Sequence, residues 1–399
     1  MGAPLRGCPH FFVSSQTLLR YYLRVLIAES KRMKISKNVK IGITTKCDEN
    51  LFGNGLNQNV WFLHRLLNGA GYDVHLVSES NKHYGKKLIT QDILPLTAEN
   101  IKEYDMIIEC AFALENPTAD ALIQSGGVRI GVQYGNRLLI DLENMLFKPE
   151  SAGIGKKEIH EIWCSPHFEF SIPALEILEK TEMYVCPYIW SPDIVTHTYI
   201  NFKIDPFFKP STNINNISFF EPNLNIVKSC MIPMIVVEDL YNRRPELIND
   251  VYNFGSLKLA KHQTFLSMVS KLNLKKDKKI SFEGRYKFVW ALHKEFAGTI
   301  VSHHWMNGLN YLQLEAMYFG TPFVHNSEFF KDHGYYFPEW DAKEGSRQLE
   351  RAIETHKGIY LKERERDREK LWEFHPDNPK NIQGYVDLIE NALAKHLRK

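Results

Sequence analysis

A glutamate, Glu315, stands in the mostly apolar stretch from Asn310 to Phe319, where a charge without a partner would be costly. The stretch reads as a helix, with Asn310 as N-cap and the amides of Tyr311 and Leu312 at its positive end. Such a helix end binds anions, and a carboxylate one turn along can accept two hydrogen bonds from a ribose diol. The pattern therefore predicts a site for a nucleotide with a diphosphate group. The alternative is a buried strand-and-helix unit with an ordinary surface glutamate.

Two basic residues follow predicted strands and have the chemistry to bind phosphate. Lys228 lies early in a predicted helix after the strand 217–220, and Arg285 follows the strand 280–282. An ammonium group attracts phosphate as a point charge, and a guanidinium group can bind it through two parallel hydrogen bonds. The alternative for both side chains is solvation at the surface. We expect Lys228 and Arg285 to neutralise the diphosphate.

A segment rich in glycine and amide side chains, residues 51–59, lies between the first predicted strand and the predicted helix 60–68. Glycine lets the backbone approach a ligand closely, and amide side chains both donate and accept hydrogen bonds. The alternative is a turn with a helix cap, since Gly and Asn favour turns in any protein. We expect a loop that binds an acceptor substrate through Asn54, Gly55, Asn57 and Gln58.

Predicted strands and helices alternate along most of the chain, which is typical of an α/β fold with parallel sheets. The strands are expected at residues 39–45, 73–77, 105–110, 128–134, 161–165, 183–185, 217–220, 280–282, 299–301 and 323–325. Ligands of such sheets bind at the carboxyl ends of the strands. Glu109, Gln133, His167 and His303 stand at or just past strand ends, so each either faces a cleft or is an ordinary loop residue.

Composition bounds the class of protein. The chain has 399 residues, of which 44% are hydrophobic and 24% charged. These values are typical of a soluble globular protein, and the length suits two domains. The six cysteines form no CxxC pair, so the sequence predicts neither a disulfide framework nor a zinc site.

Residues 1–38 differ from the rest of the chain. They hold seven Lys or Arg against one acid; because the whole chain has a formal charge of +2, the remainder carries −4. The apolar run 11–28 is interrupted by Arg20 and Arg24, which makes it a poor membrane span. The alternatives are a disordered or targeting segment, an amphipathic surface anchor, or upstream sequence before a start at Met33. The last is favoured because the first strand begins only after residue 38.

The stretch 307–322 resembles the donor-site motif of retaining GT-B glycosyltransferases. In that motif a glutamate and seven further residues precede Glu-Ala-Met, and Gly-x-Pro follows. Glu315-Ala316-Met317 and Gly320-Thr321-Pro322 match it, whereas Asn307 stands in place of the first glutamate. The resemblance implies that Asn307 lies near the transferred sugar. Because an amide brings no charge, retention or inversion of configuration stays open.

A closer resemblance covers most of residues 40–340. The chain is similar to a bacterial family of expected glycosyltransferases that is filed as a domain of unknown function. The matching words are Asn54-Gly55 with Asn57-Gln58-Asn59, Glu161-Ile162-Trp163, Phe220-Glu221-Pro222-Asn223, Val227-Lys228, Ile232-Pro233-Met234, Gly284-Arg285, Val301-Ser302-His303, Asn310-Tyr311, Val324-His325-Asn326-Ser327 and Gly334-Tyr335-Tyr336. These short motifs identify a family far better than they identify its substrate.

The resemblance implies two Rossmann-like domains that face a cleft. We expect an acceptor domain at 39–190, a donor domain at 191–375, and a helix at 376–399 that returns to the first domain. The expected donor site is Lys228, Arg285, Asn310, Tyr311, Leu312 and Glu315, and the expected catalytic residues are Glu109, His303 and Asn307. No metal or cofactor is expected, because cationic side chains and helix amides can take the charge of the leaving diphosphate.

The expected activity is transfer of a hexosyl or pentosyl group from a nucleoside-diphosphate sugar to a glycan or lipid-linked acceptor. The expected location is the cytoplasm, with contact to a membrane surface left open. Three alternatives remain: glycosylation of a modified DNA base, a sugar-nucleotide epimerase of the GT-B class, and a binding protein without turnover. The charge of −4 on the core disfavours a nucleic-acid partner.

Deletion of residues 1–32 should leave the melting temperature and the donor affinity unchanged. The reason is that the segment precedes the first predicted strand, and a chain terminus outside the core contributes little to stability. Thermal unfolding of the full-length and shortened proteins checks this. A large drop in melting temperature on deletion would show that the segment belongs to the core.

Overall fold

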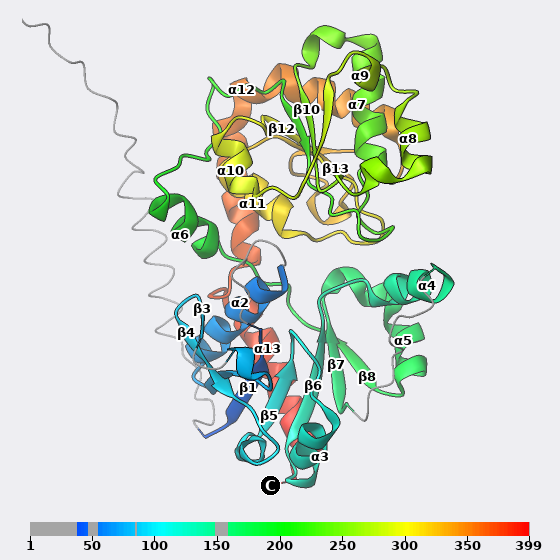
Figure 1. The fold of residues 1–399 in the computed structure, drawn as a ribbon. Coiled ribbons are helices and arrows are strands. Elements are labelled where there is room, and N and C mark those ends of the chain that lie inside the picture. Colours follow the sequence, from blue (N-terminus) through cyan, green and yellow to red (C-terminus); the bar gives the residue numbers. More distant parts are fainter. Residues whose placement is uncertain (1–37, 47–54, 84–85, 148–158, 399) are drawn as a thin grey trace, which may run out of the picture.

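The computed structural model describes residues 38–46, 55–83, 86–147 and 159–398. These residues form two α/β domains, one above the other in Figure 1, each built on a largely parallel sheet. Most of the extension 1–38, and Asn54 of the expected acceptor loop, lie outside the described residues. Two parallel-sheet domains are what the alternation of strands and helices predicts.

The first domain contains an eight-stranded sheet in the order β3-β4-β2-β1-β5-β6-β7-β8. Its strands are β1 (Lys40–Thr44), β2 (Asp73–Ser78), β3 (Lys87–Leu88), β4 (Gln91–Pro95), β5 (Met106–Glu109), β6 (Val128–Gln133), β7 (Glu161–Cys164) and β8 (Glu182–Val185). Every neighbouring pair is parallel except β3 with β4. The central strands are almost wholly apolar and buried, as expected where helices cover both faces of a parallel sheet.

The second domain contains a six-stranded parallel sheet in the order β11-β10-β9-β12-β13-β14. Its strands are β9 (Ile217–Phe219), β10 (Val251–Phe254), β11 (Ile280–Glu283), β12 (Thr299–Val301), β13 (Phe323–His325) and β14 (Tyr335–Tyr336). In both sheets the strand order reverses near the middle, between β1 and β5 and between β9 and β12. Ligands of open α/β sheets bind at such switch points.

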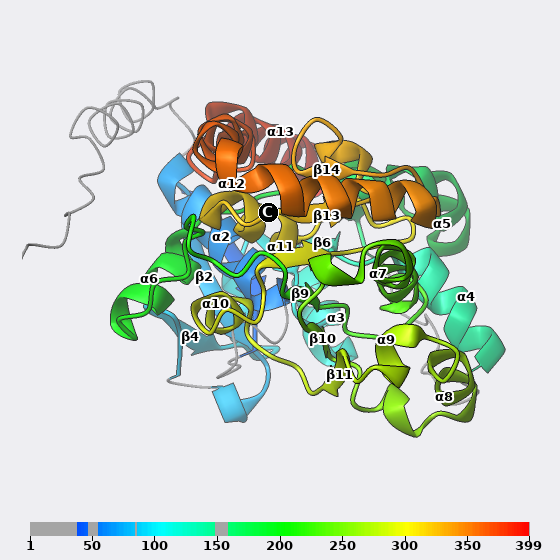
Figure 2. The ribbon, with the colours of Figure 1, turned by 90° about the horizontal axis from the view of Figure 1, so that it is seen from above.

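Helices connect and cover the strands. Those of the first domain are α2 (Gly55–Ala70), α3 (Asn116–Gln124), α4 (Arg137–Phe147) and α5 (Ile172–Glu179), and those that follow are α6 (Asp193–Asn201), α7 (Met231–Arg243), α8 (Gln263–Val269), α9 (Asn273–Lys276), α10 (Phe288–His293), α11 (Tyr311–Phe319), α12 (Ala342–Glu373) and α13 (Pro379–His396). Seen from above, the long helix α12 extends along the second domain beside α7 (Figure 2). Among the described helices, none combines the length and apolar character needed to cross a bilayer.

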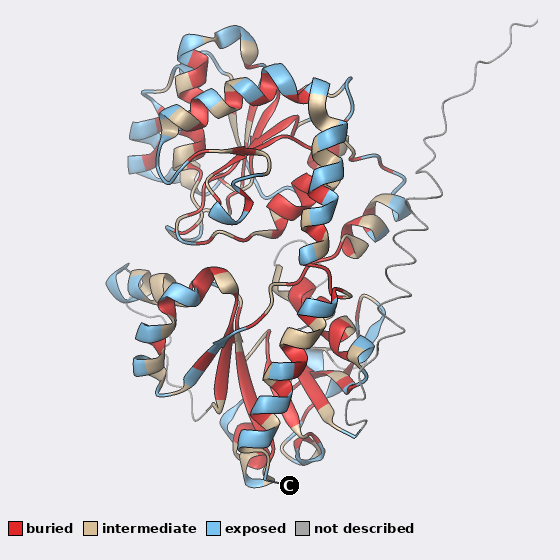
Figure 3. Cartoon of the chain, turned by 180° about the vertical axis from the view of Figure 1, so that it is seen from behind, coloured by how far each residue is buried: buried red, intermediate tan, exposed pale blue. Residues whose placement is uncertain are grey.

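The chain crosses between the domains twice, and the two crossings are bonded to each other. The amide of Trp190 donates to the carbonyl of Phe374 at 2.8 Å, and the Tyr385 hydroxyl donates to the carbonyl of Pro187 at 2.9 Å. Helix α13 then packs against α2 and β6, with Tyr385 and Ile389 fully buried (Figure 3). The predicted return of the C-terminal helix to the first domain is thereby confirmed.

The sequence located ten of these strands, and it missed four. The predicted segments coincide with β1, β2, β5, β6, β7, β8, β9, β11, β12 and β13. The strands that were missed are β3 and β14, which have two residues each, β4, which is mostly exposed, and β10, which is mostly apolar and buried and was overlooked. Two helix starts were also wrong. Helix α2 begins at Gly55 rather than Val60, and the helix after β9 begins at Met231 rather than before Lys228.

Candidate active site

Polar groups from both sheets meet where the two domains touch. Asn136, just after β6, donates from Nδ2 to the carbonyl of Met306 at 2.7 Å, in the segment between β12 and α11. Glu143 on α4 accepts a hydrogen bond of 2.9 Å from the amide of Ile226, in the segment after β9. Each contact joins segments that follow the carboxyl ends of strands, the location predicted for ligand binding. We call this region the interdomain site.

The donor helix α11 has the ends that the sequence predicts. The Asn310 side chain caps it by accepting from the amide of Leu312 at 3.3 Å, and Gly320 ends it in the left-handed conformation at φ 69°. Asn310 Nδ2 lies 3.3 Å from His304 Nε2. The amide of Leu312 is therefore already bonded, and of the two predicted anion-binding amides only that of Tyr311 stays a candidate.

Glu315 is buried in the middle of α11 with 5% of its surface exposed. Among the described residues, no side chain or backbone group bonds to its carboxylate. Burial raises the pKa of Glu315 to about 8, because the charged form loses its hydration. A buried carboxyl group in this state is suited to receive hydrogen bonds from a ligand, and the ribose role of Glu315 stays a prediction.

Tyr311 turns its side chain toward the first domain. Its hydroxyl donates to Asn59 Oδ1 on α2 and lies 2.9 Å from the carbonyl of Ile189 in the crossing segment. Its ring packs edge-on against Phe62 and is tilted against Tyr188. The side chain thus joins the donor helix to the acceptor domain, which leaves only the backbone of Tyr311 for the predicted contact with donor.

Replacing Tyr311 with Phe should lower the free energy of unfolding by about 1 kcal/mol, because the hydroxyl is lost while Asn59 keeps a buried, unsatisfied oxygen. Donor affinity should change less than threefold if only the backbone meets the ligand. Chemical denaturation and nucleotide titration of the same variant check both statements. A loss of affinity at unchanged stability would instead place the hydroxyl on the donor.

Lys228 lies in the loop between β9 and α7, where its backbone pairs with His304 in an isolated antiparallel bridge. The amide of Trp305 also donates to Val227 at 2.9 Å, so this loop is fixed against the segment that leads to α11. Burial lowers the pKa of Lys228 to about 8, and the nearby Glu221 opposes that shift. The ammonium group therefore lies partly dehydrated near Glu221, His304 and His167, and its role as a phosphate ligand stays a prediction.

Arg285 has a different position. It is exposed just after β11, the edge strand of the second sheet, and β10 separates that strand from β9. The loops that carry Arg285 and Lys228 therefore follow strands that are not neighbours in the sheet. A shared role in neutralising a diphosphate stays a prediction for Arg285.

His303 and Asn307 frame the segment between β12 and α11. His303 Nε2 donates to the carbonyl of Glu339 at 2.9 Å, and burial lowers its pKa to about 4, so the imidazole is neutral at pH 7. Asn307 is buried, and its Nδ2 has no hydrogen-bond partner among the described residues. Met306, just before it, has a left-handed backbone at φ 49°. Asn307 thus offers a hydrogen-bond donor to a ligand, whereas His303 Nε2 is already bonded to the carbonyl of Glu339.

Glu109 ends β5 and is engaged within the first domain. Its Oε1 accepts from Arg129 Nε at 2.7 Å and from the amide of Leu114 at 3.0 Å, and both charged side chains are buried. Breaking such a pair leaves an uncompensated buried charge. The geometry favours a structural role, and the predicted catalytic role of Glu109 has no support from these contacts.

Three of the expected acceptor residues, Gly55, Asn57 and Gln58, begin helix α2 rather than a loop. Asn57 and Gln58 are buried in its first turns, and Gly55 faces the ring of Tyr311 at 3.4 Å from the position of a Cβ atom. A Cβ atom would make an ordinary van der Waals contact there, so the approach of α11 does not by itself require glycine. Binding of an acceptor by these residues stays a prediction.

Two histidines outside the expected donor, acceptor and catalytic residues lie at the interdomain site; of these, the sequence indicated His167 only as one of several residues at strand ends. His304 Nε2 lies 3.3 Å from Asn310 Nδ2 and 3.3 Å from Ser302 Oγ, and the imidazole is buried against the backbone of Asn307. His167, in the 3-10 helix after β7, has no partner for Nδ1 in the described residues. Burial, with a contribution from the charge of Lys228 across the interface, lowers the pKa of His167 to about 3. The feature of the sequence that indicates a site role for His167 is its position just past the end of a strand.

Glu221 is a third group whose role the sequence did not assign, although it belongs to the matching words. It is 1% exposed, and its Oε1 accepts from the amide of His303 at 3.3 Å, while Oε2 has no partner among the described residues. Burial raises its pKa to about 7. Glu221 lies close to Lys228, and its negative charge raises the pKa of the lysine.

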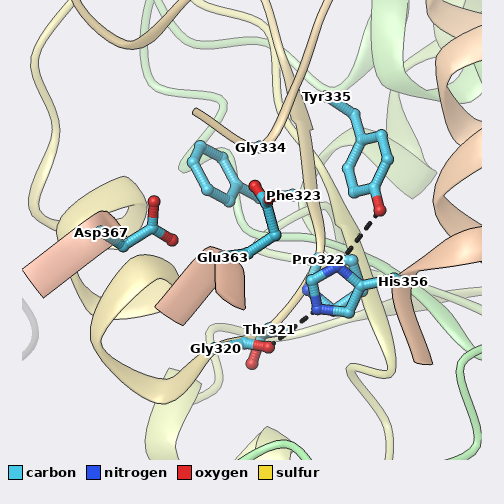
Figure 4. Close-up of a pocket in the computed structure, with 9 residues that line it drawn as sticks. All are labelled: Gly320, Thr321, Pro322, Phe323, Gly334, Tyr335, His356, Glu363 and Asp367. Atoms are coloured by element: carbon cyan, nitrogen blue, oxygen red, sulfur yellow. Dashed lines mark hydrogen bonds between the residues drawn. The ribbon is translucent and has the colours of Figure 1, made fainter. Parts of the chain in front are cut away.

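A small pocket behind α11 is not the substrate site. It lies between the turn after α11, β14 and α12 and has room for about one water molecule (Figure 4). Its lining residues are Gly320, Thr321, Pro322, Phe323, Gly334, Tyr335, His356, Glu363 and Asp367. His356 donates there to the carbonyl of Gly320 at 3.0 Å and so supports the end of the donor helix. In the described part of the chain, no three His, Cys, Asp or Glu side chains gather as metal ligands.

The two parallel-sheet domains, their contact at the carboxyl strand ends and the returning helix α13 define the GT-B class of folds. The chain belongs to the family described as "Protein of unknown function (DUF2827)", whose model matches residues 39–389. Among curated proteins, none matches the sequence.

Solved structures of the same fold are similar over nearly the whole chain. An alpha-glucosyltransferase in complex with UDP and a DNA 13-mer containing an HMU base has 14% identity and a TM-score of 0.55, covering 90% of this chain and 100% of that one. HepE of Anabaena with UDP and glucose has 10% identity and a TM-score of 0.52, covering 88% and 99%. The O-GlcNAc transferase of Thermobaculum terrenum has 11% identity and a TM-score of 0.56, covering 95% and 74%. At these identities the similarity shows the fold.

Proposed function

We propose that this protein is a glycosyltransferase that uses a nucleoside-diphosphate sugar. The observation that carries the proposal is Glu315, a buried carboxyl group without a partner in the described residues, on the helix whose N-terminus lies at the interdomain site. A ribose diol supplies the two donors that such a group lacks. The solved structures with UDP or UDP-glucose support this choice of ligand on the same fold.

The second domain supplies the complementary charges for a diphosphate. Lys228 provides a partly dehydrated ammonium group, and Asn307 Nδ2 is a buried donor without a partner in the described chain. Preorganised donors in a buried site stabilise negative charge that develops on a leaving group. We infer that no metal ion is needed, since these groups take the charge of the departing nucleoside diphosphate.

Transfer forms a bond between an acceptor oxygen and the anomeric carbon and breaks the bond from that carbon to the diphosphate. The acceptor hydroxyl gives up one proton, either to a protein base or to the leaving phosphate. In the first domain, His167 is close enough to Lys228 for the lysine charge to lower its pKa, and its Nδ1 has no hydrogen-bond partner in the described chain. Asn136 holds the donor segment in place through Met306.

The proposed acceptor is a glycan or a lipid-linked sugar, and the proposed location is the cytoplasm, with contact to a membrane surface. Glycosylation of a modified DNA base is a second candidate, because the fold is shared with an enzyme crystallised on DNA with an HMU base. The formal charge of −4 after residue 38 weighs against it.

Thermal unfolding with a panel of UDP-, GDP-, ADP- and dTDP-sugars, followed by mass spectrometry of the donor, tests the proposal. One nucleotide sugar should raise the melting temperature and be consumed slowly by water, and faster when an acceptor is added. Conversion of the sugar without an acceptor would identify an epimerase. Binding without any consumption would indicate a protein without turnover, and no shift with any nucleotide would overturn the proposal.

A further inference from the structure

The helix α4 has an unusual surface for a soluble protein. Its sequence is RLLIDLENMLF, with seven apolar residues in eleven, yet none of its residues is buried. At its C-terminal end, Met145, Leu146 and Phe147 are 69%, 67% and 74% exposed. A helix that is apolar on most sides is normally covered, so this one is expected to have a partner.

Neighbouring segments extend the apolar surface. Helix α5 contributes Ile177 and Leu178, which are 81% and 57% exposed, and its C-terminal Glu179 pairs with Arg137 at the start of α4. The two helices lie together at one end of the first domain (Figure 1). We call the exposed side chains of Leu142, Met145, Leu146, Phe147, Ile177 and Leu178 the α4–α5 surface. Ile177 and Leu178 lie toward the start of α4, where Glu179 meets Arg137, and Met145, Leu146 and Phe147 lie at its other end, so the surface extends along the length of α4.

This surface is continuous with the interdomain site. Asn136, the residue before α4, bonds to the donor segment, and Glu143 in the middle of α4 bonds to the amide of Ile226 across the interface. Ile226 and Leu224 in that loop are themselves 47% and 57% exposed. Two residues further along the same loop is Lys228. An apolar occupant of α4 therefore reaches the groups proposed to bind the donor, and it contacts both domains.

The charges on the same elements narrow the class of occupant. Helices α4 and α5 with the 3-10 helix between them carry more acids than bases: Asp141, Glu143, Glu169, Glu176 and Glu179 against Arg137. Acidic residues repel a phosphate backbone and an anionic bilayer surface alike. The occupant should therefore be apolar and should carry no dense negative charge beside these helices.

We propose that the α4–α5 surface holds the hydrocarbon chain of an amphiphilic acceptor, so that the acceptor is lipid-linked rather than a soluble glycan or DNA. The inference rests on the proposed glycosyltransferase function. The chain would lie along α4 with its sugar or hydroxyl head group at the interdomain site, beside His167 and the donor. The transferred sugar bonds to that hydroxyl, and the nucleoside diphosphate leaves as described above.

Two measurements test the proposal. With the donor identified, alkyl glucosides of increasing chain length, from methyl to octyl, serve as acceptor probes below the concentrations at which they form micelles. The acceptor KM should fall by roughly three- to fourfold for each methylene that becomes buried, while kcat stays similar. Independently of any donor, the protein should co-sediment with phosphatidylcholine vesicles, and adding phosphatidylglycerol should not strengthen binding.

A triple variant, Met145→Gln, Leu146→Gln and Phe147→Gln, keeps good helix formers and removes the apolar side chains. It should lose the dependence on chain length and bind the vesicles at least roughly tenfold less tightly for each side chain that enters the lipid. Leu361→Gln is the matched control, since Leu361 is 59% exposed on α12 of the other domain. It should behave as the wild type, and all variants should melt at the wild-type temperature.

Each result has a separate meaning. Equal KM values for methyl and octyl acceptors, together with vesicle binding that the triple variant leaves unchanged, would overturn the inference while the transferase proposal stands. A dimer in analytical ultracentrifugation that the triple variant converts to a monomer would also overturn it, because the surface would then bind a second copy. Failure to consume any nucleotide sugar would remove the proposed function, and vesicle binding would still report on the surface.

Discussion

Glu315→Ala should weaken donor binding by at least roughly a hundredfold, and Glu315→Gln by roughly tenfold. The ionised carboxylate is proposed to accept hydrogen bonds from both ribose hydroxyls, which lower its pKa from the value of about 8 in the free protein, and a hydrogen bond to a charged group is worth about 1.5–3 kcal/mol. Alanine loses both bonds, while glutamine keeps the shape and one oxygen but loses the charge. Isothermal titration of the nucleotide against wild type and both variants measures the effect.

A nucleotide that lacks the ribose 2′-hydroxyl is the control for this assignment. Wild type should bind the deoxy analogue more weakly than the ribonucleotide, and Glu315→Ala should hardly distinguish the two. If the alanine variant distinguishes the two nucleotides as well as wild type does, Glu315 does not contact the ribose hydroxyls. The assignment of α11 as the donor helix would then lose its main support.

The same residue also predicts a pH dependence of stability without any ligand. In the folded protein burial holds the pKa of Glu315 at about 8, above the unfolded value of 4.5. The folded state therefore retains a proton that the unfolded state has lost, so stability falls as the pH rises from about 4.5 to about 8. Glu315→Gln removes this cost. It should raise the melting temperature at pH 8.5 and change it little at pH 4.5.

The segment from β12 to β13 could be predicted from the sequence almost to the residue. Its signals are local: an apolar strand, Asn310 as a cap, and Gly320 followed by Pro322 as a stop. Each of these acts within a few residues through the backbone, so no knowledge of the tertiary structure is needed. The motif resemblance lies in the same segment, and for this reason it indicated the fold class correctly.

The side-chain partners of the candidate site could not be predicted in this way. Tyr311 bonds to Asn59, which is 252 residues away in sequence, and Glu109 pairs with Arg129 on the neighbouring strand. Whether a polar residue at a strand end faces a ligand or a protein partner depends on such distant contacts. Strand-end position alone therefore named Glu109 and missed His304, although both follow the same pattern.

The first residues of helices were also predicted poorly, because polar residues in the first turn of a helix have the composition of a loop. Residues 55–59 read as glycine and amides, yet they begin α2 because its first turn packs on Tyr311 of the other domain. Before α7, the opposite error arose from the apolar residues near Lys228. They suggested a helix, but the backbone there pairs with His304 instead. At α2 a contact between the domains overrides the local preference, and before α7 a backbone pairing within the second domain does so.

The second large effect is expected at Lys228. Lys228→Ala should weaken binding of a nucleoside diphosphate by roughly ten- to a hundredfold at pH 7, because a charge-assisted contact of about 1.5–3 kcal/mol is lost. Arg285→Ala tests the other basic residue and should have a smaller effect, since its side chain is exposed after the edge strand. Equal losses from the two variants would show that Arg285 also reaches the diphosphate.

The pH dependence separates the charge of Lys228 from its shape. Burial lowers the pKa of Lys228 to about 8, so the free protein loses the ammonium proton as the pH rises above that value. Nucleotide affinity of the wild type should therefore fall above pH 8 by up to roughly tenfold per pH unit. Lys228→Arg keeps its charge throughout this range and should bind equally well at pH 7 and pH 9. Glu221 gains its own negative charge near pH 7, which also weakens nucleotide binding. The variant Glu221→Gln is the control for this effect. It should remove only the part of the loss of affinity that occurs below pH 8. An affinity of the wild type that stays constant to pH 9.5 would show that the Lys228 ammonium group does not contact the diphosphate.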